Sequence, residues 1–275
     1  MNYSADIKKI ERNYLPENFA VTTWSELEPY FKELTERPLN SVAEMEKWLK
    51  DVSELEAVVS EDACWRQIRM TCDTENKALE EAFNYFYLEI QPKLQPYADQ
   101  LNRKLVNSPL AADLDQEKYF TYLRSVKKSI ELFREQNIPL QAELNVLQQQ
   151  YGAISGKMTV EVDGREYTLQ QAARFLENSD RKVREEVYRK IQERRLQDKD
   201  ALNELFSKLI TLRNQIAVNA GFANYRDYKF VDMGRFDYSP SACFQFHEAV
   251  KQHVIPLVNE IYTQQQKKLG LDDFR

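Results

Sequence analysis

The chain has 275 residues and a formal net charge of −6, with 43% hydrophobic and 30% charged residues, which excludes an intrinsically disordered protein. Acidic and basic residues are interspersed, so we expect no basic face for nucleic acid, and no apolar run is long enough to span a membrane. Only 6 glycines are present, whereas good helix formers are abundant, and the composition therefore predicts an all-α fold of long antiparallel helices.

The first 20 residues are expected to form an irregular segment, and two helices with capping boxes follow it. In residues 23–26 and 41–44, a Thr or Ser is followed three residues later by Glu, a pair that can satisfy two free backbone amides at a helix start. Apolar residues at three- and four-residue steps give each helix one buried face. The second helix is predicted to continue through Trp65 and Ile68.

Prolines punctuate the next part of the chain. A helix is predicted over about residues 74–90, and Pro92 and Pro96 should kink or interrupt the helical path because proline lacks the backbone N–H group. Residues 110–155 are predicted to form an antiparallel pair of helices that turns at Pro139.

One β-hairpin is predicted near residues 158–167. Apolar and polar residues alternate over 158–162, and Asp163-Gly164 supplies the positive φ angles of a tight turn. Residues 168–171 then form a capping box for the next helix. Because a lone hairpin is marginally stable in water, it must pack on helices or on a partner sheet.

Residues 180–220 contain neither proline nor glycine and are predicted to form one helix about 60 Å long. Its first half is highly charged and should have a solvated face, with Val183, Val187 and Ile191 as its apolar seam, and its second half should be more deeply buried. Gly221 is the expected left-handed stop. The last helix is predicted to start at Ser239, with Pro240 in its first turn, and to end near Gly270.

The cysteines and the N-terminus indicate a cytoplasmic protein. Cys64, Cys72 and Cys243 lie within helical patterns, and we interpret them as buried free thiols in a reducing compartment. The first residues show no signal-peptide pattern.

No catalytic residue and no metal ligand is predicted in this chain. His247-Glu248 resembles the start of a zinc-binding helix, but the second histidine, His253, is six residues on and roughly 120° around a helix. Neither a Gly-rich phosphate loop nor a serine-nucleophile motif is present. Adjacent acidic residues diverge on a helix and fit a solvated surface better than an acid–base pair.

Aromatic residues are the one excess, with 15 Tyr and 14 Phe. Tyr225, Tyr228, Phe236 and Tyr238 are candidates for lining a peptide-binding channel, because tyrosine is amphipathic and stacks well. Ordinary core packing is the alternative interpretation of these residues.

The corner after residue 220 resembles the oligoendopeptidase F family of zinc oligopeptidases. The resemblance rests on Gly-Phe-Ala-Asn-Tyr-Arg-Asp-Tyr at 221–228 and Arg-Phe-Asp-Tyr-Ser-Pro at 235–240. The hairpin, the helix start after it, Ser-Asp-Arg-Lys-Val-Arg at 179–184 and the ending at 269–275 agree with the family. The layout matches over the whole chain, and the motifs match over residues 156–275.

The resemblance implies an N-terminal portion of a larger enzyme. Family members are about twice this long, and their His-Glu-x-x-His helix and third zinc ligand lie in the second half, onto which no residue here maps. Residues 1–155 would form an N-terminal helical lobe, and 156–275 would begin the peptidase domain. The parent would hold one zinc ion and cleave short oligopeptides, whereas this chain would supply scaffold and channel wall and be inactive alone.

A different class of function stays open, namely a stand-alone helical module that binds peptides or proteins without catalysis. If the chain is half of a larger core, it should also expose apolar surface where the missing half docks, and it should then self-associate. We expect that surface on residues 239–269 and near the hairpin.

Overall fold

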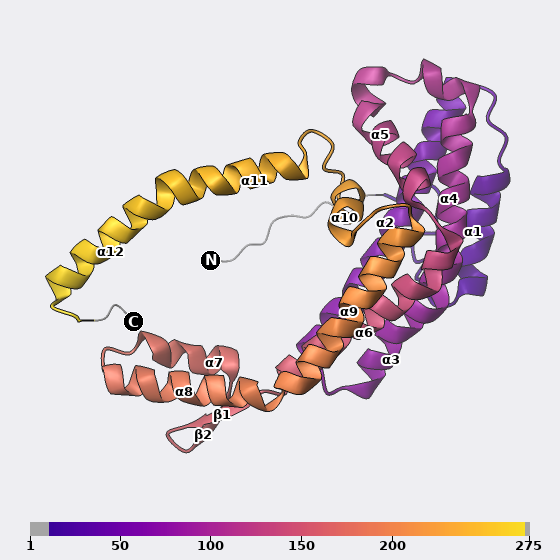
Figure 1. The fold of residues 1–275 in the computed structure, drawn as a ribbon. Helices are drawn as coiled ribbons and strands as arrows, with labels where there is room; N and C mark the ends of the chain where they lie inside the picture. Colours follow the sequence, from indigo (N-terminus) through magenta and orange to yellow (C-terminus); the bar gives the residue numbers. More distant parts are fainter. Residues whose placement is uncertain (1–10, 273–275) are drawn as a thin grey trace.

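The chain is built almost wholly from helices. The structure, a computed structural model, describes residues 11–272 and contains helices α1 to α12, one two-stranded sheet and short 3-10 and π-helical segments (Figure 1). The predicted all-α fold with one small hairpin is confirmed. Residues 1–10 of the predicted N-terminal segment and the last three residues of the chain lie outside the described residues. Within the described range, no helix is both long and apolar enough to cross a membrane.

Helices α1 to α5 enclose the largest apolar cluster, which we call the N-terminal lobe. Their bounds are α1 Trp24–Glu36, α2 Val42–Cys72, α3 Lys77–Tyr85, α4 Gln91–Asn107 and α5 Gln116–Leu132. Phe31, Trp48 and Leu55, on the predicted apolar faces of α1 and α2, are at most 1% exposed. The far end of α2 is helical as predicted, but Trp65 and Ile68 stay 49% and 46% exposed there.

The first predicted capping box does not form, and the second forms only in part. Thr23 makes no capping bond with its side chain, and the Glu26 carboxylate instead accepts a hydrogen bond from the hydroxyl of Thr22. The Ser41 hydroxyl does accept from the Glu44 amide at 3.2 Å. However, the Glu44 carboxylate accepts from the amide of the residue before Ser41, at 2.8 Å.

Prolines do not interrupt the helical path between α3 and α4. The turn Phe86–Ile90 widens into a π-helix directly before α4, and Pro92 then occupies the first turn of α4. A π-turn of the same length, Val250–Val254, precedes Pro256 later in the chain. A proline ring clashes with the carbonyl four residues earlier in a regular α-helix, and the wider turn relieves that clash. Pro96 lies inside α4, which also continues.

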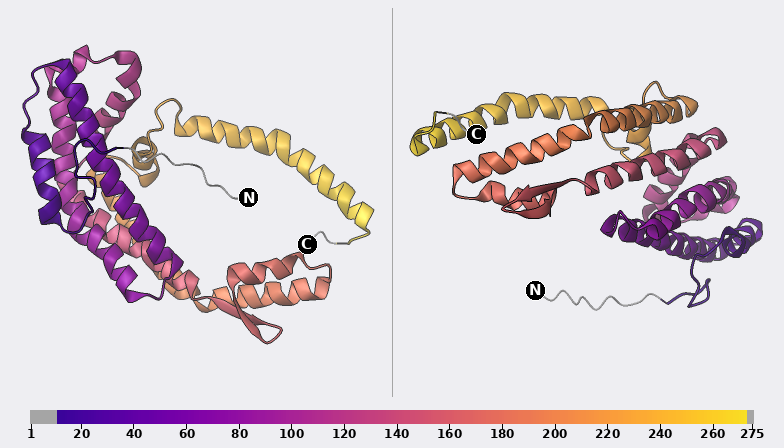
Figure 2. Two further views of the ribbon diagram at one scale, coloured as in Figure 1. Left: turned by 180° about the vertical axis from the view of Figure 1, so that it is seen from behind. Right: turned by 90° about the horizontal axis from the view of Figure 1, so that it is seen from below.

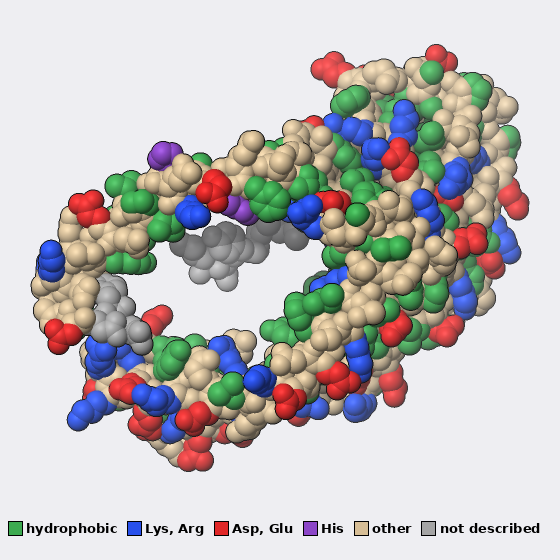
Figure 3. All heavy atoms as spheres, in the orientation of Figure 1, with side chains coloured by type: hydrophobic (Ala, Val, Ile, Leu, Met, Phe, Trp, Pro, Cys, Tyr) green, Lys and Arg blue, Asp and Glu red, His purple; other side chains and the backbone are tan. Residues whose placement is uncertain are grey.

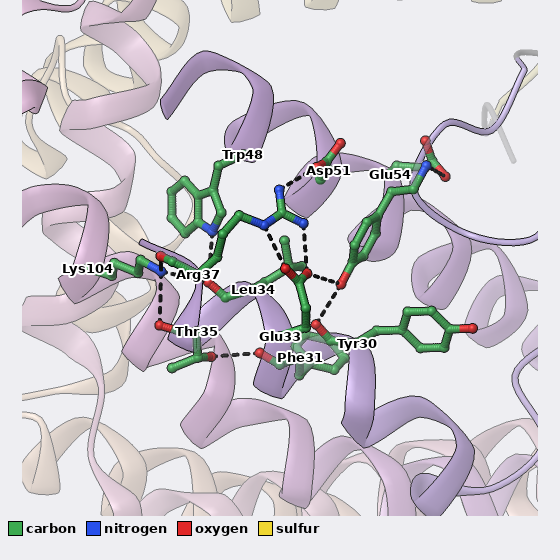
Figure 4. A network of polar contacts seen from close by, with 11 residues as sticks. Tyr30, Phe31, Glu33, Leu34, Thr35, Arg37, Trp48, Asp51, Glu54 and Lys104 are labelled. Atoms are coloured by element: carbon green, nitrogen blue, oxygen red, sulfur yellow. Dashed lines mark hydrogen bonds and ion pairs between the residues drawn. The ribbon is translucent and has the colours of Figure 1, made fainter. Parts of the chain in front are cut away.

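The C-terminal end of α1 is held by a side chain from α4 (Figure 4). The Lys104 ammonium donates hydrogen bonds to the carbonyls of Leu34 (2.8 Å), Thr35 (2.9 Å) and Arg37 (2.5 Å). The Trp48 indole N–H also donates to Leu34, at 2.9 Å, and its ring lies 5.4 Å from the Lys104 nitrogen. The lysine therefore satisfies carbonyls that a helix end leaves without partners.

The predicted 60 Å helix is two helices, joined at Asp198. Their bounds are α8 Arg181–Gln197 and α9 Lys199–Asn219. Asp198 has φ −99° and ψ 11° and forms an ion pair with Arg194 at 2.5 Å. The break separates two packing surfaces, because α8 packs on the hairpin side and α9 packs on α6, Ile138–Gly156. The predicted seam of the first half is confirmed, because Val187 and Ile191 are 1% and 4% exposed and Val183 packs beside them.

The hairpin has the predicted turn and packs on helices as expected. Strands β1 Thr159–Val162 and β2 Arg165–Thr168 pair antiparallel, and the turn residues Asp163 and Gly164 have φ angles of 52° and 73°. Its apolar face is buried against α7, Leu169–Ala173, and α8. The predicted capping box at Thr168 forms in full, with Gln171 as its partner.

The C-terminal helices leave the body of the molecule. After α10, Tyr225–Asp232, the helices α11 Pro240–Ala249 and α12 Ile255–Leu269 run outward in one continuous path, which we call the arm (Figure 2). No residue of the arm is buried. The space-filling view shows an open space between the arm and α7 to α9 (Figure 3).

Two expectations on burial and domains can be compared with this arrangement. Cys64 and Cys72 are exposed and Cys243 is half-buried, so the prediction of buried thiols is wrong, although all three are free. Cys64 and Cys72 lie near the far end of α2. Trp65 and Ile68 are also exposed there, which shows that this side of the helix is not covered. Residues from both sides of the predicted boundary after residue 155 share an apolar cluster, and the two-domain division stays a prediction.

Candidate functional site

The aromatic corner begins where α9 ends. Gly221 has a φ of 90°, a conformation that favours glycine, and the amide of Phe222 closes the helix on the carbonyl of Ala217 at 2.9 Å. Asn224 then opens α10, because its side-chain oxygen accepts from the amide of Asp227 at 3.0 Å. The chain therefore reverses within a few residues and sets α10 against α9 and α5.

Two of the four predicted channel residues belong to the packed interior. Tyr228 is 6% exposed, and its ring lies 5.7 Å from that of Phe222 and 5.9 Å from that of Tyr225. Tyr225 is half-buried, with the guanidinium of Arg213 5.8 Å from its ring. Both rings therefore pack at the end of α9, and their place in a peptide channel stays a prediction.

Tyr228 titrates far above the ordinary range. Burial raises the pKa of its phenol to about 12, and the negative charge of Asp232 and the neighbouring Tyr225 act in the same direction. A hydrogen bond with Gln141 partly opposes them. At neutral pH the phenol is uncharged and serves as a hydrogen-bonding group rather than as a base.

The other two candidates lie in the linker 233–239, between α10 and the arm. Phe236 is half-buried, with the guanidinium of Arg124 on α5 4.7 Å from its ring. Tyr238 is 50% exposed and meets Phe230 edge-on at 5.4 Å. The linker is therefore attached to the lobe at Phe236 and faces solvent at Tyr238.

A pocket of about 410 Å³ between α5, α10 and the linker brings two of the four candidates together. Tyr228 and Phe236 line it, whereas Tyr225 and Tyr238 do not. Three charged side chains also line the pocket, namely Lys128, Arg134 and Asp232. No pattern in the sequence connects α5 with a corner about a hundred residues further on, so these residues could not be predicted.

The charges of this pocket are compensated within the protein. Arg134 donates to the carbonyls of Glu131 (3.1 Å) and Ala220 (3.4 Å), at the C-terminal ends of α5 and α9. Lys128 pairs with Glu131 at 2.6 Å, and Asp232 pairs with Lys229. The three charged side chains therefore have partners within the protein, and the pocket is a polar junction between α5, α9 and the corner.

The larger candidate surface is the open space beside the arm. Hydrophobic side chains are visible on the arm and across the opening (Figure 3). The large apolar residues exposed on the arm by 46% or more are Phe244, Phe246, Val254, Ile255, Leu257, Ile261, Tyr262 and Leu269. On α8 and α9, Tyr188, Leu196, Phe206, Ile210 and Val218 are each at least 50% exposed. Exposed large apolar residues gathered along one element are typical of a binding or docking face.

The location of this surface agrees only in part with the one expected from the sequence. The expectation that the last helix lacks a partner agrees with the exposure of the arm. Near the hairpin the strands themselves are covered, with Val160 and Val162 7% and 4% exposed beneath α7 and α8, whereas Tyr188 and Leu196 on α8 are exposed. The strands find their cover within the chain, whereas the arm does not.

The described residues do not fit a zinc ion. His247 and His253 are both exposed on the arm, and the ring of His247 lies 6.3 Å from those of Phe244 and Phe246. No group of three or more His, Cys, Asp or Glu side chains within residues 11–272 is placed to hold a metal ion.

Two family models match the chain. A model of the peptidase M3 N-terminal domain matches residues 16–133, and a model of peptidase family M3 matches residues 174–275. No curated protein sequence matches the chain.

Several solved structures share its fold. A structure assigned as an oligoendopeptidase F has a TM-score of 0.86 at 23% identity, over 94% of this chain and 46% of its own. One assigned as an oligoendopeptidase F from Bacillus anthracis str. Ames has a TM-score of 0.86 at 19% identity, over 95% and 48%. PZ peptidase A, solved with an inhibitor, has a TM-score of 0.86 at 21% identity, over 94% and 46%. The chain thus spans about half the length of these proteins.

Proposed function

Because the chain belongs to peptidase family M3, we propose that it is the N-terminal portion of a zinc metalloendopeptidase that hydrolyses short oligopeptides inside a deep channel. The observation that carries the proposal is the match of two M3 models in their order along the chain, together with a fold that covers about half of the similar structures. This portion supplies scaffold and one wall of the channel.

Zinc enters the proposal as a property of the parent protein only. No ligand set lies within residues 11–272, so the metal and the residues that activate water belong to sequence beyond this chain. The apolar face of the arm would then be covered by that sequence, and the open space would become part of the enclosed channel. The proposed substrates are short oligopeptides, with no nucleic acid or membrane partner, and free cysteines support a cytoplasmic location.

The first experiment is a hydrolysis assay with the pure 275-residue chain. An internally quenched oligopeptide is incubated with the chain, with and without added zinc and with a chelator. We expect no turnover above the buffer blank, because no group of three or more His, Cys, Asp or Glu side chains within residues 11–272 is placed to hold a metal ion. Chelator-sensitive turnover would contradict the proposal that this portion is inactive alone.

A stand-alone binding module is the second candidate function, and the exposed apolar surface beside the open space favours it. The mass of the native product in its source cell separates the two. A product of about twice 32.5 kDa supports the peptidase parent, whereas a product of 32.5 kDa supports binding without catalysis.

A further inference from the structure

The arm is joined to the molecule through very little structure. The linker 233–239 contains Gly234, whose φ of 66° ends α10, and no other regular element precedes Pro240. None of the arm residues is buried, although Pro240, Ala242 and Cys243 at its start are half-buried, so packing of the arm contributes little to its direction. The contacts of the linker therefore matter more for that direction.

Arg124 on α5 makes that contact. Its guanidinium lies 4.7 Å from the ring centroid of Phe236 in the linker and 5.3 Å from that of Phe120 on its own helix. It also forms an ion pair with Asp237 at 3.0 Å. The cation is therefore placed between two rings and is bound to two consecutive linker residues.

The relative strength of these contacts can be estimated from exposure. Asp237 is 77% exposed, and ion pairs of that kind contribute little because solvent screens them. The Arg124 side chain is only 30% exposed, and its Nε is buried without a hydrogen-bond partner. A partly desolvated cation over an aromatic face gains more than an exposed ion pair. Stacking on Phe236 is therefore the dominant contact.

We propose that Arg124, stacked between Phe120 and Phe236, is a latch that sets the direction of the arm and so the width of the open space. Arg226 provides a second contact nearby, with its guanidinium 5.5 Å from the ring of Phe244 at the start of the arm. That contact lies within the corner itself and does not join the arm to α5. The inference does not depend on the proposed peptidase function, since it concerns the position of the arm alone.

The test measures the distance between arm and lobe directly. Spin labels are attached to Cys64 on α2 and to Gln252→Cys on the arm, in a background of Cys72→Ser and Cys243→Ser. Distances are measured by double electron–electron resonance. The labelled chain is diluted with unlabelled chain, so that only distances within one molecule contribute to the signal. Circular dichroism and the melting temperature show whether each variant is folded.

The latch predicts which substitutions broaden the distance distribution. Arg124→Gln removes both cation–π contacts, and the ratio of latched to unlatched arms should fall about tenfold. Phe236→Leu should give a similar broadening. Asp237→Asn should leave the distribution close to that of the parent, because the exposed ion pair contributes little. Arg124→Lys keeps the charge but loses the flat stacking surface, and should resemble Arg124→Gln.

Lys127→Gln on the same helix is the matched control. Lys127 is exposed, and its replacement removes the same positive charge as Arg124→Gln. A distribution that is unchanged in Arg124→Gln and Phe236→Leu overturns the proposal. Equal broadening in Lys127→Gln also overturns it, since charge alone would then explain the effect. Broadening in Asp237→Asn but not in Phe236→Leu would reject stacking as the basis of the latch.

Discussion

At the scale of single residues, long polar side chains satisfy backbone groups at helix ends and in the irregular segment before α1. Lys104 binds three carbonyls at the end of α1. Asn137, 2% exposed, donates to the carbonyl of Ile216 at 3.0 Å and accepts from Asn219 at 2.7 Å at the end of α9. Glu54 on α2 accepts from three consecutive amides, those of residues 13–15. Each of these bonds joins segments far apart in sequence.

Replacing Lys104 with Met should destabilise the protein by about 2 to 3 kcal/mol, because three part-buried carbonyls lose a charged donor. Burial and the neighbouring Arg37 lower the pKa of Lys104, and the negative charge of Glu33 opposes them. The measurement is the free energy of unfolding in urea. Lys93→Met on the same helix is the control, since Lys93 forms only an exposed ion pair with Glu89 at 3.2 Å. Equal losses in both variants would contradict the capping role.

Tyr228 should make stability fall at alkaline pH. The folded pKa of about 12 lies above the unfolded value of 10.0, so the unfolded chain loses its proton first as pH rises. The contribution of Tyr228 to the free energy of unfolding is complete below pH 10.0. It is lost as pH rises towards 12, by about 1 kcal/mol per pH unit.

The check compares the free energy of unfolding at pH 9 and pH 11 in the parent and in Tyr228→Phe. Other tyrosines titrate in both proteins, so the difference between the two slopes isolates Tyr228. Tyr188→Phe, at an exposed tyrosine, should keep the parent slope. A Tyr228→Phe slope equal to that of the parent would show that burial does not shift this phenol.

At the scale of elements, local backbone geometry decides where helices turn. The π-turns before Pro92 and Pro256 let two helices continue through prolines, and Asp198 separates α8 from α9 without proline or glycine. Gly221 then ends α9 in a left-handed conformation, so that α10 can return along α9. These turns place the aromatic corner against α5.

Two glycine-to-alanine substitutions should have opposite effects. Gly221→Ala should destabilise by about 1 kcal/mol, because a φ of 90° is strained for a residue with a Cβ. Gly152→Ala, inside α6 with no atom within 4 Å of the added Cβ, should stabilise by up to about 1 kcal/mol. Melting temperatures of both variants check this. The same sign for both changes would mean that local conformation does not control these positions.

At the scale of the whole molecule, a well-packed lobe carries an arm in which no residue is buried. The lobe buries large side chains from α1, α2 and α4, whereas the arm exposes its apolar residues along its whole length (Figure 3). Apolar surface of this extent is unfavourable in water unless another surface covers it. We propose that the isolated chain covers it by self-association.

Light scattering over a range of concentrations measures this directly. The mass should rise with concentration above 32.5 kDa, and Leu257→Glu with Ile261→Glu should return it to the monomer. Gln252→Glu with Gln265→Glu adds the same charge to the arm without removing apolar surface, and should still associate. A parent chain that is monomeric at every concentration would reject the proposal.

The helical class, the hairpin with its turn, the left-handed stop at Gly221 and the family resemblance could all be predicted from the amino-acid sequence. These features depend on local periodicity, on turn residues and on motifs that are contiguous in the chain. Tyr228 and Phe236 were also among the residues predicted to lie at a site, and both line one pocket.

Which helix faces are covered by other elements could be seen only in the tertiary structure. The break at Asp198, the burial of Tyr228, the exposure of Cys64 and the position of Arg124 against Phe236 all depend on which elements lie side by side. A helical pattern shows that one face is apolar, but it does not show whether the chain supplies a partner for that face. In the lobe and at the hairpin it does, whereas no residue of the arm is buried by the part of the chain that the structure describes.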